Sequence, residues 1–384
     1  MRLPVYLDNH ATTPLDPRVL EAMLPYLRED FGNASSIDHA YGARAAEAVE
    51  MARRRVAKSI GAADEEIIFT SGATESDNLA LMGLIPSRDL PSSHFVTSAI
   101  EHKAVLDSFR RLEDGGAKVT YLPVDSLGMV SARDLETAVT PRTKLVSIMW
   151  ANNEVGTIQD IATLSDIAHR AGVPFHTDAA QAVGHVPVDV EAAEVDMMSF
   201  SGHKTHGPKG IGGLYVRRLE RRIRLTPLLM GGGQERGLRS GTLNVPGIVG
   251  LGEALALAAR ELGSEGKRLR GLRDELQRRL LETPDVQVNG NPDSRLPNNL
   301  NLRIKGVDGK ALIGAVAKSV AFSASSACAT QTVEPSHVLL ALGLTPREAH
   351  SCVRFGLGRF TTSEEISFAA SEMSRFIPRL RLLA

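Results

Sequence analysis

One lysine stands in a segment whose residue types could hold an anionic cofactor. The segment from 199 to 215 reads SFSGHKTHGPKGIGGLY, and Lys204 follows its apolar start. Ser201 and His203 could donate hydrogen bonds to a phosphate, and the glycines would let backbone N–H groups approach it, while the lysine amine could bond to an aldehyde. An ordinary surface lysine is the alternative. The segment lacks the Gly-Lys-Thr core of a P-loop, and the serine at 199 excludes a Gly-x-Ser-x-Gly elbow.

A carboxylate and an amide follow a second apolar run, VPFHTDAAQAVG. Asp178 ends this run, where an unpaired carboxylate would be costly. Helix capping could explain it. It could instead be the acidic partner that keeps a pyridoxal ring nitrogen protonated, since protonation makes that ring an electron sink. Gln181, three residues later, would then reach the ring hydroxyl from the same helical face.

Two further strand ends carry candidate site residues. The run SGATESDN, from Ser71 onward, opens a predicted helix after EIIFT, and His102 follows HFVTSAIE. Glycine and hydroxyls at a helix N-terminus favour an anion, although N-capping alone would also explain them. His102 could be structural, or it could stack on a flat ring and move protons near neutral pH. Together with Lys204 and Asp178, the run predicts a phosphate cradle.

The two cysteines, Cys328 and Cys352, cannot make a disulfide framework, which favours a reducing compartment. Cys352 lies in the apolar run HSCVRFG, which is typical of a buried residue, whereas Cys328 lies among small polar residues in SASSACAT, which predict a loop. An accessible thiol there suits a nucleophile that takes an atom from one molecule and passes it on. Arg354 could hold a substrate carboxylate with its guanidinium fork. The histidines show no zinc spacing, so we expect no metal.

The elements that must position these residues alternate along the chain. From Glu66 to Val216, short apolar runs (EIIFT, HFVTSAI, KLVSIMW, PFHTDAA, VDMMSF, GGLYV) alternate with helix-like stretches, which predicts a mostly parallel sheet covered by helices. Ligands of such sheets gather beyond the carboxyl ends of the strands, where the candidate residues lie. A long helix is expected from about Val245 to Leu281, and a smaller α+β region follows Pro284. The polar stretch from Pro86 to Ser93 is expected to be a surface loop.

The charge and the apolar content of the chain exclude some classes of function. The chain has 384 residues, with 44 basic and 45 acidic side chains and a formal net charge of -1. No global field therefore attracts nucleic acid or an anionic membrane. No stretch of about 18 apolar residues occurs, and the start MRLPVYLDNHATTP has no apolar signal region. A soluble cytoplasmic protein without membrane or direct nucleic-acid binding is expected.

The motifs taken together resemble those of the cysteine desulfurases, class-V aminotransferase-like members of the fold-type I pyridoxal-phosphate enzymes. The resemblance spans the chain and rests on YLDNHATTPLDPRV, GNASS, TSGATESDN, EHK, ANNEVGT, HTDAAQAVG, SGHKTHGPKGIGGLYVRR, RSGTLN, SACAT and VRFGLGRFTTSEEI, in that order. It implies an α/β fold with a large domain, 15–258, built on a mostly parallel seven-stranded sheet. A smaller α+β domain, 1–14 and 259–384, would carry the catalytic cysteine.

The resemblance also implies a role for each candidate residue. Lys204, Cys328 and His102 would be catalytic, as Schiff-base lysine, sulfur acceptor and ring-stacking acid-base residue. Pyridoxal 5'-phosphate would be held by Lys204, Asp178, Gln181, His102, Ala73, Thr74, Ser201 and His203, with Thr242 reaching in from a second subunit of a homodimer. The substrate would contact Asn153, Arg354 and Asn33. The spacing after SACAT resembles the branch with an extended cysteine loop, although Ser326 stands where that branch usually has glycine.

The expected reaction converts L-cysteine to L-alanine and leaves a persulfide on Cys328. A sulfur-acceptor or scaffold protein would then take the sulfur, most simply for iron–sulfur cluster assembly or tRNA thiolation. Two alternatives stay open at this point. One is a selenocysteine lyase or another class-V aminotransferase-like enzyme, which would need no thiol at this position. The other is a non-catalytic sulfur-relay or scaffold protein that kept only the shape.

Overall fold

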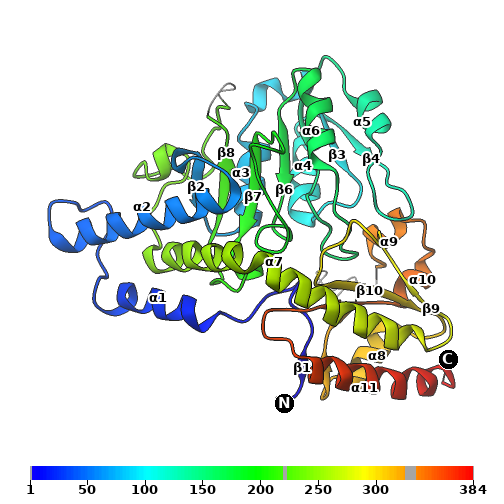
Figure 1. The fold of residues 1–384 in the computed structure, drawn as a ribbon. Helices are drawn as coiled ribbons and strands as arrows, with labels where there is room; N and C mark the ends of the chain where they lie inside the picture. The colour runs from blue at the N-terminus through cyan, green and yellow to red at the C-terminus, as the bar shows by residue number, and fades with distance from the viewer. Residues whose placement is uncertain (1, 219–222, 325–333, 384) are drawn as a thin grey trace.

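The computed structural model describes residues 2–218, 223–324 and 334–383 (Figure 1). Its largest sheet has seven strands in the order β2-β8-β7-β6-β5-β3-β4. The strands are β2 (Ile67–Thr70), β3 (His94–Ser98), β4 (Lys118–Leu122), β5 (Thr143–Ser147), β6 (Phe175–Asp178), β7 (Met197–Ser201) and β8 (Gly212–Val216). β8 runs antiparallel to both of its neighbours, and every other pair in this sheet is parallel. The predicted mostly parallel sheet is confirmed.

The apolar runs named in the sequence account for every strand of this sheet except β4. β4 lies at the edge beside β3, and its residues Lys118 to Tyr121 are exposed or half-buried. Such an edge strand has no continuous apolar run because one side of it faces solvent. The polar stretch expected to be a loop contains the short 3-10 helix η2 (Ser87–Ser92).

Helices cover both faces of the large sheet. Alternate strand residues point to opposite faces, so Ile67 and Phe69 pack into one hydrophobic core and Ile68 into another. The first core is closed by α2 (Ala40–Ile60), α6 (Ile161–Arg170) and the first half of α7, and the second by α3 (Ala73–Met82) and α4 (Lys103–Asp114). Continuous burial on both faces explains why these strands are apolar throughout.

The long helix α7 (Val245–Leu281) joins the two parts of the molecule (Figure 1). Asn244 caps its start by accepting a hydrogen bond from the Gly247 N–H at 3.1 Å. Leu251 and Leu255 of its first half lie in the core of the large sheet, whereas Leu269 and Leu276 lie in a separate core. The predicted long helix is confirmed, and the division between 258 and 259, inside this helix, stays a prediction.

The core that contains Leu269 and Leu276 belongs to a smaller α+β region. Its main sheet has the order β12-β13-β10-β9, and β1 pairs in parallel with β11. The strands are β1 (Val5–Tyr6), β9 (Val286–Val288), β10 (Asn299–Ile304), β11 (Val320–Ala321), β12 (Ser323–Ala324) and β13 (Cys352–Gly356), and the helices are α8 (Gly309–Val316), α9 (His337–Ala341), α10 (Pro346–His350) and α11 (Ser363–Arg381). Val5 and Leu7 are buried in this core, so the N-terminal segment packs with residues far along the chain.

The remaining α-helices pack on helices described above. α1 (Pro17–Arg28) packs on α7, and α5 (Ala132–Ala138) packs on α6. The short 3-10 helices η1 (Asp64–Glu66), η3 (Gly202–Lys204) and η4 (Glu235–Gly237) lie in connections. Within the described part of the chain, no helix combines the length and the apolar composition that crossing a membrane would require.

Candidate active site

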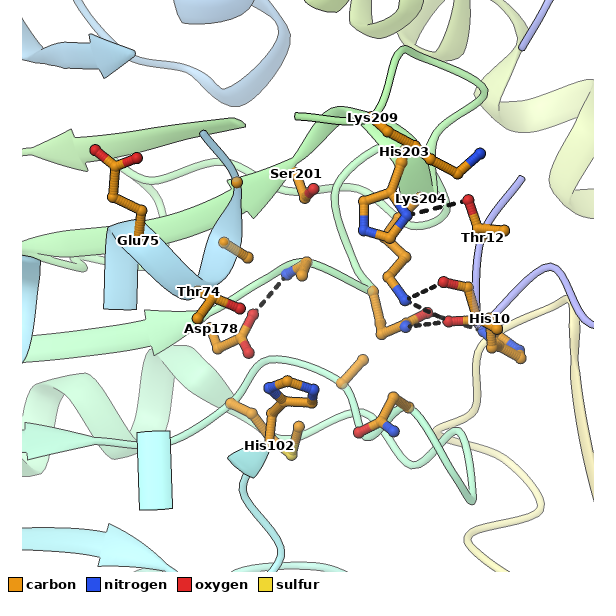
Figure 2. Close-up of a pocket in the computed structure, with 18 of the residues that line it drawn as sticks. His10, Thr12, Thr74, Glu75, His102, Asp178, Ser201, His203, Lys204 and Lys209 are labelled. Atoms are coloured by element: carbon orange, nitrogen blue, oxygen red, sulfur yellow. Dashed lines mark hydrogen bonds between the residues drawn. The ribbon is translucent and has the colours of Figure 1, made fainter. Parts of the chain in front are cut away.

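A cavity of about 540 Å³ lies at the carboxyl end of the large sheet (Figure 2). The connections that follow β2, β3, β5, β6 and β7 contribute to its wall, together with the N-terminal segment and β13. The predicted site residues that line it are Ala73, Thr74, His102, Asn153, Asp178, Gln181, Ser201, His203, Lys204 and Arg354. Parallel strands end at one edge of a sheet, and this brings together side chains that are far apart in the sequence.

Lys204 ends η3, directly after β7. Its Nζ donates hydrogen bonds to the carbonyl oxygens of His10 at 2.5 Å and Ala11 at 2.9 Å. The Lys204 carbonyl accepts a hydrogen bond from His185 Nε2 at 2.8 Å, which holds the backbone at this point. In Figure 2 the lysine amine points to the N-terminal segment, and Asp178 and His102 lie across the cavity from it. The amine is therefore within the cavity and not on the outer surface.

Asp178 is the last residue of β6 and is 5 % exposed. Burial raises its pKa, while the charges of His102 and Lys204 and a hydrogen bond from the Ala180 N–H, 2.9 Å from Oδ1, act in the opposite direction. Behind it, Asp77 of α3 is also buried, and burial together with repulsion from Asp178 raises the pKa of Asp77 well above its ordinary value. A cation placed against Asp178 would offset the cost of burying its charge. A protonated pyridine nitrogen meets that requirement.

Gln181 lines the cavity as predicted, but its amide is tied to a residue that sequence reasoning missed. Gln181 Oε1 lies 2.8 Å from His10 Nδ1, and Gln181 Nε2 donates to the His10 carbonyl at 3.1 Å. Burial lowers the pKa of His10 well below its ordinary value, so the imidazole is neutral. A neutral His10 donates from Nδ1 to the amide oxygen and fixes the orientation of Gln181. The run DNHATT is a polar cluster that follows an apolar run. This is the sequence feature from which His10 could have been predicted as a site residue.

The phosphate end of the cavity is formed by the start of α3. Gly72 is the N-cap residue and no side chain caps the helix, so its first N–H groups remain available to an anion. Gly72 has a φ of 152°, a conformation that favours glycine, and a Cβ at this position would lie 3.8 Å from Ser201 Oγ. Simple N-capping by a hydroxyl, the alternative to an anion site, is not what the structure shows. An anion here would meet Thr74 and Ser201 as further donors.

Three neighbouring side chains set the charge at this end of the cavity. Burial lowers the pKa of His203 to about 4, so it is a neutral hydrogen-bonding group, and its Nδ1 lies 3.2 Å from Thr12 Oγ1. Lys209, which sequence reasoning missed, is exposed and lines the cavity. Glu75 also lines it but is paired with Arg239, 2.9 Å away. The net charge at this end therefore favours an anion.

Arg354 reaches the cavity from β13. Its Nη1 donates to the Asn153 carbonyl at 3.1 Å and its Nη2 to Asp8 Oδ1 at 2.9 Å, while its Nε has no hydrogen-bond partner among the described residues. The guanidinium is thus fixed in place and retains donor capacity. Such a group suits a carboxylate ligand. Asp8, another residue that sequence reasoning missed, carries no signal of its own beyond its place in the motif YLDNHATT.

Two predicted residues are not brought to the cavity. Asn33 and Thr242 are exposed and do not line it, and Thr242 was expected to act in a second subunit. Cys328, like Ser326, lies outside the described residues. The other cysteine, Cys352, is buried as predicted, and burial raises the pKa of its thiol to about 12, which makes it unreactive. Among the described residues, no group of three His, Cys, Asp or Glu side chains could hold a metal ion.

Comparison with known proteins adds sequence and structural relatives. The profile of the family described as Aminotransferase class-V matches residues 5–368. A relative named cysteine desulfurase IscS from Anaeromyxobacter dehalogenans (strain 2CP-C) is 51 % identical over 382 residues, covering 99 % of this chain and 94 % of the relative. A solved structure titled NIFS-LIKE PROTEIN has a TM-score of 0.92 at 39 % identity, covering 98 % and 100 % of the two chains. Another, titled SspA in complex with cysteine, has a TM-score of 0.82 at 38 % identity, covering 93 % and 99 %.

Proposed function

Because this chain belongs to the class-V aminotransferase family, and within it to the cysteine desulfurases, we propose that its cavity binds pyridoxal 5'-phosphate and L-cysteine. The reaction yields L-alanine and a persulfide on Cys328. The observation that carries the proposal is the convergence of Lys204, Asp178 and Arg354 on one cavity, since these are an amine, a buried acid and a guanidinium. Ionisable side chains are costly to bury, so three of them would not converge on one cavity if they served only to stabilise the fold.

The residues of the cavity fit the cofactor. When bound, pyridoxal phosphate supplies an aldehyde that bonds to amines and a protonated ring that withdraws electrons from the substrate. Lys204 Nζ is the amine assigned to the aldehyde, and Asp178 is the partner of the ring nitrogen. The start of α3, with Ser201 and His203, is assigned to the phosphate. His102, at the end of β3, is assigned to the face of the ring.

The substrate clamp is assigned to Arg354 and Asn153. Arg354 is 2 % exposed and fixed on two sides, so it can offer its remaining donors to the carboxylate of the substrate with little loss of side-chain entropy. The relative whose solved structure is titled as a complex with cysteine supports this substrate. Lys204 Nζ is the base assigned to the α-proton of the substrate.

Sulfur transfer needs no external oxidant or reductant. The Cys328 thiolate attacks the substrate sulfur, an S–S bond forms, and the Cβ–S bond breaks with its electron pair left on carbon. That carbon takes a proton, a role that we assign to Lys204 or His102, and L-alanine results. The enzyme sulfur now carries the transferred sulfur as a persulfide. An acceptor or scaffold protein would remove it, for iron–sulfur cluster assembly or tRNA thiolation.

A homodimer is part of the proposal. Large apolar side chains are exposed in the segment before α2 and on α2, including Phe31 at 68 %, Ile37 at 67 % and Tyr41 at 47 %, and Met230, twelve positions before Thr242, is 83 % exposed. Exposed apolar side chains of this size are typical of a surface that another chain covers. Asn33 lies between the first two in sequence. In such a dimer, Thr242 and Asn33 would complete the cavity of the partner subunit.

The test is a direct assay of both products. The purified protein, supplied with pyridoxal phosphate and cysteine, should form alanine, and mass spectrometry should find one added sulfur on Cys328. Cys328→Ala should keep the yellow colour of the bound cofactor and form no persulfide. Normal sulfide release by Cys328→Ala would refute the role of this thiol. It would favour a lyase that needs no thiol at this position.

A further inference from the structure

His10 contacts one side chain of the cavity through both its backbone and its imidazole. Its carbonyl oxygen accepts a hydrogen bond from Gln181 Nε2 at 3.1 Å, and its Nδ1 lies 2.8 Å from Gln181 Oε1. The same carbonyl oxygen accepts a hydrogen bond from Lys204 Nζ at 2.5 Å (Figure 2). His10 therefore engages both the nitrogen and the oxygen of the Gln181 amide, next to the amine assigned to the cofactor.

These two contacts leave the Gln181 amide only one orientation. A carbonyl oxygen can only accept a hydrogen bond, so the amide nitrogen, and not the amide oxygen, must face the His10 carbonyl. The amide oxygen then faces His10 Nδ1. Because this oxygen also only accepts, the imidazole must carry its proton on Nδ1. His10 Nε2 has no hydrogen-bond partner among the described residues, so no contact there favours a proton on Nε2 instead.

The imidazole of His10 is neutral, which limits it to a single proton. Burial lowers the pKa of His10 well below its ordinary value. Arg354 on β13, Lys204 on η3 and His185 after β6 lower it further, and the hydrogen bond with Gln181 acts in the opposite direction. The one proton of the ring is therefore directed at the Gln181 amide oxygen.

The small region holds this imidazole in place. The Asn9 N–H and Asn9 Nδ2 both donate to the Gly356 carbonyl, at 3.0 Å and 2.8 Å. The Gly356 N–H donates to the Leu7 carbonyl at 2.7 Å. A Cβ on Gly356 would lie 2.8 Å from His10 Cδ2 and 2.7 Å from the His10 backbone nitrogen, so only glycine leaves room for the ring. The imidazole is thus packed against β13 in the position that reaches Gln181.

Gln181 in this orientation presents a donor to the cavity. Its amide nitrogen has two N–H groups, and the His10 carbonyl uses one of them. Because Gln181 lines the cavity, the second N–H is the group that remains for the ring oxygen of the cofactor. A donor stabilises an oxygen that carries negative charge and lowers its pKa. An inverted amide would place a second acceptor there and repel the charged oxygen.

We propose that His10 is a positioning residue that makes Gln181 a hydrogen-bond donor to the ring oxygen of pyridoxal phosphate and so keeps this oxygen ionised at neutral pH. The inference rests on the proposed function. In the bound cofactor the ring oxygen and the lysine nitrogen share one proton, and the colour changes when that proton leaves. A donor to the ring oxygen favours loss of this proton, so it lowers the pH at which the colour changes.

The test follows the visible absorbance of the bound cofactor against pH. His10→Leu and His10→Phe both remove the imidazole donor, and His10→Phe keeps a flat ring. His10→Asn keeps a donor, because the amide nitrogen of asparagine is as many bonds from Cα as Nδ1 of histidine. His94→Leu is the matched control, since His94 is also buried, is hydrogen-bonded to Thr143 Oγ1 at 2.8 Å and does not line the cavity.

The pH midpoint of the colour change should rise by about 1 in His10→Leu and in His10→Phe, the effect of losing one hydrogen bond to a charged oxygen. His10→Asn should stay close to the unaltered protein. His94→Leu should lower the Tm without moving the midpoint. Gln181→Leu should also raise the midpoint, and adding His10→Leu to it should raise it no further, because the imidazole acts only through Gln181.

Nitrogen-15 NMR of the protein without cofactor tests the geometry separately. The chain has 11 histidines, and the signals of His10 are those missing from His10→Leu. The spectrum at pH 7 should show a neutral ring with its proton on Nδ1. Gln181→Leu should change the shift of this nitrogen, because it removes the acceptor.

Three results would overturn the inference. They are an unmoved midpoint in both His10→Leu and His10→Phe, an equal rise in His94→Leu, and a proton on Nε2 of His10. Failure of the proposed function is distinguishable, because the unaltered protein would then show no visible band with pyridoxal phosphate. The inference would fall with it, although NMR would still find the proton on Nδ1.

Discussion

Glu101 offers a test of the buried electrostatics of the site. Its side chain is 0 % exposed, its Oε1 accepts hydrogen bonds from Ser98 Oγ at 2.6 Å and the Met149 N–H at 2.8 Å, and its Oε2 has no partner among the described residues. Burial raises the pKa of Glu101 from 4.5 to about 8, although these two hydrogen bonds favour the charged form. Glu101→Gln keeps the shape and the acceptor oxygen but cannot ionise.

The direction of the effect follows from proton binding. In the unfolded chain Glu101 loses its proton near pH 4.5, whereas the folded protein keeps it until about pH 8. Its contribution to stability is therefore complete below pH 4.5 and is lost as pH rises through 8. Between pH 6 and pH 9 the loss amounts to about 3 kcal/mol, at about 1.4 kcal/mol per pKa unit. At a typical unfolding entropy of about 2 cal/mol/K per residue, this corresponds to roughly 3–4 °C in Tm.

The assay is thermal unfolding of the cofactor-loaded protein at fixed protein and cofactor concentrations, at pH 6 and pH 9. The Tm of Glu101→Gln relative to the unaltered protein should rise by roughly 3–4 °C between the two pH values. Glu47→Gln, which removes an exposed carboxylate from α2, is the matched control and should show no such rise. A Tm difference for Glu101→Gln that is the same at both pH values would refute the assignment of Glu101 as a buried neutral acid.

Four further substitutions test other contacts of the structure. Lys204→Ala should abolish the colour of the covalently held cofactor, and an unchanged visible spectrum would rule out Lys204 as its amine. Asp178→Asn should still bind cofactor but lower kcat by at least about a hundredfold, because an amide cannot keep the ring nitrogen protonated; an unchanged kcat would remove that role. Arg354→Lys should raise the KM for cysteine about tenfold or more with a smaller change in kcat, and a pure kcat effect would contradict a carboxylate clamp. Glu235→Gln should lower the free energy of unfolding by about 3 kcal/mol in urea titration, because it breaks a buried pair with Arg53 at 2.8 Å; a loss below about 1 kcal/mol would show that this pair contributes little.

Local pattern was enough to predict most of the fold. Apolar runs followed by polar residues placed Thr74, His102, Asn153, Asp178 and Lys204 at strand ends, and the structure brings all of them to one cavity. Those runs are visible because strands buried on both faces must be apolar along their whole length. β4 was not predicted, because an edge strand is only partly buried and therefore has no continuous apolar run.

The contacts between distant residues could not be predicted in this way. Gln181 is tied to His10, which is 171 positions away, and Arg354 to Asp8, which is 346 positions away. Neither pair has a spacing that any helix or strand period would reveal. These contacts exist because β1 pairs with β11 of the small region, which places the N-terminal segment against the cavity.

The sequence by itself determined which chemical groups are present and on which strand ends they stand, because strand and helix periods are local properties of the chain. Only the tertiary structure decided which of these groups meet, how deeply each is buried and therefore which protonation state it holds. Burial and long-range contacts depend on how whole elements dock. The hydrogen bond from the Ser336 hydroxyl to the Glu154 carboxyl group, for example, forms only because α9 docks on the large region.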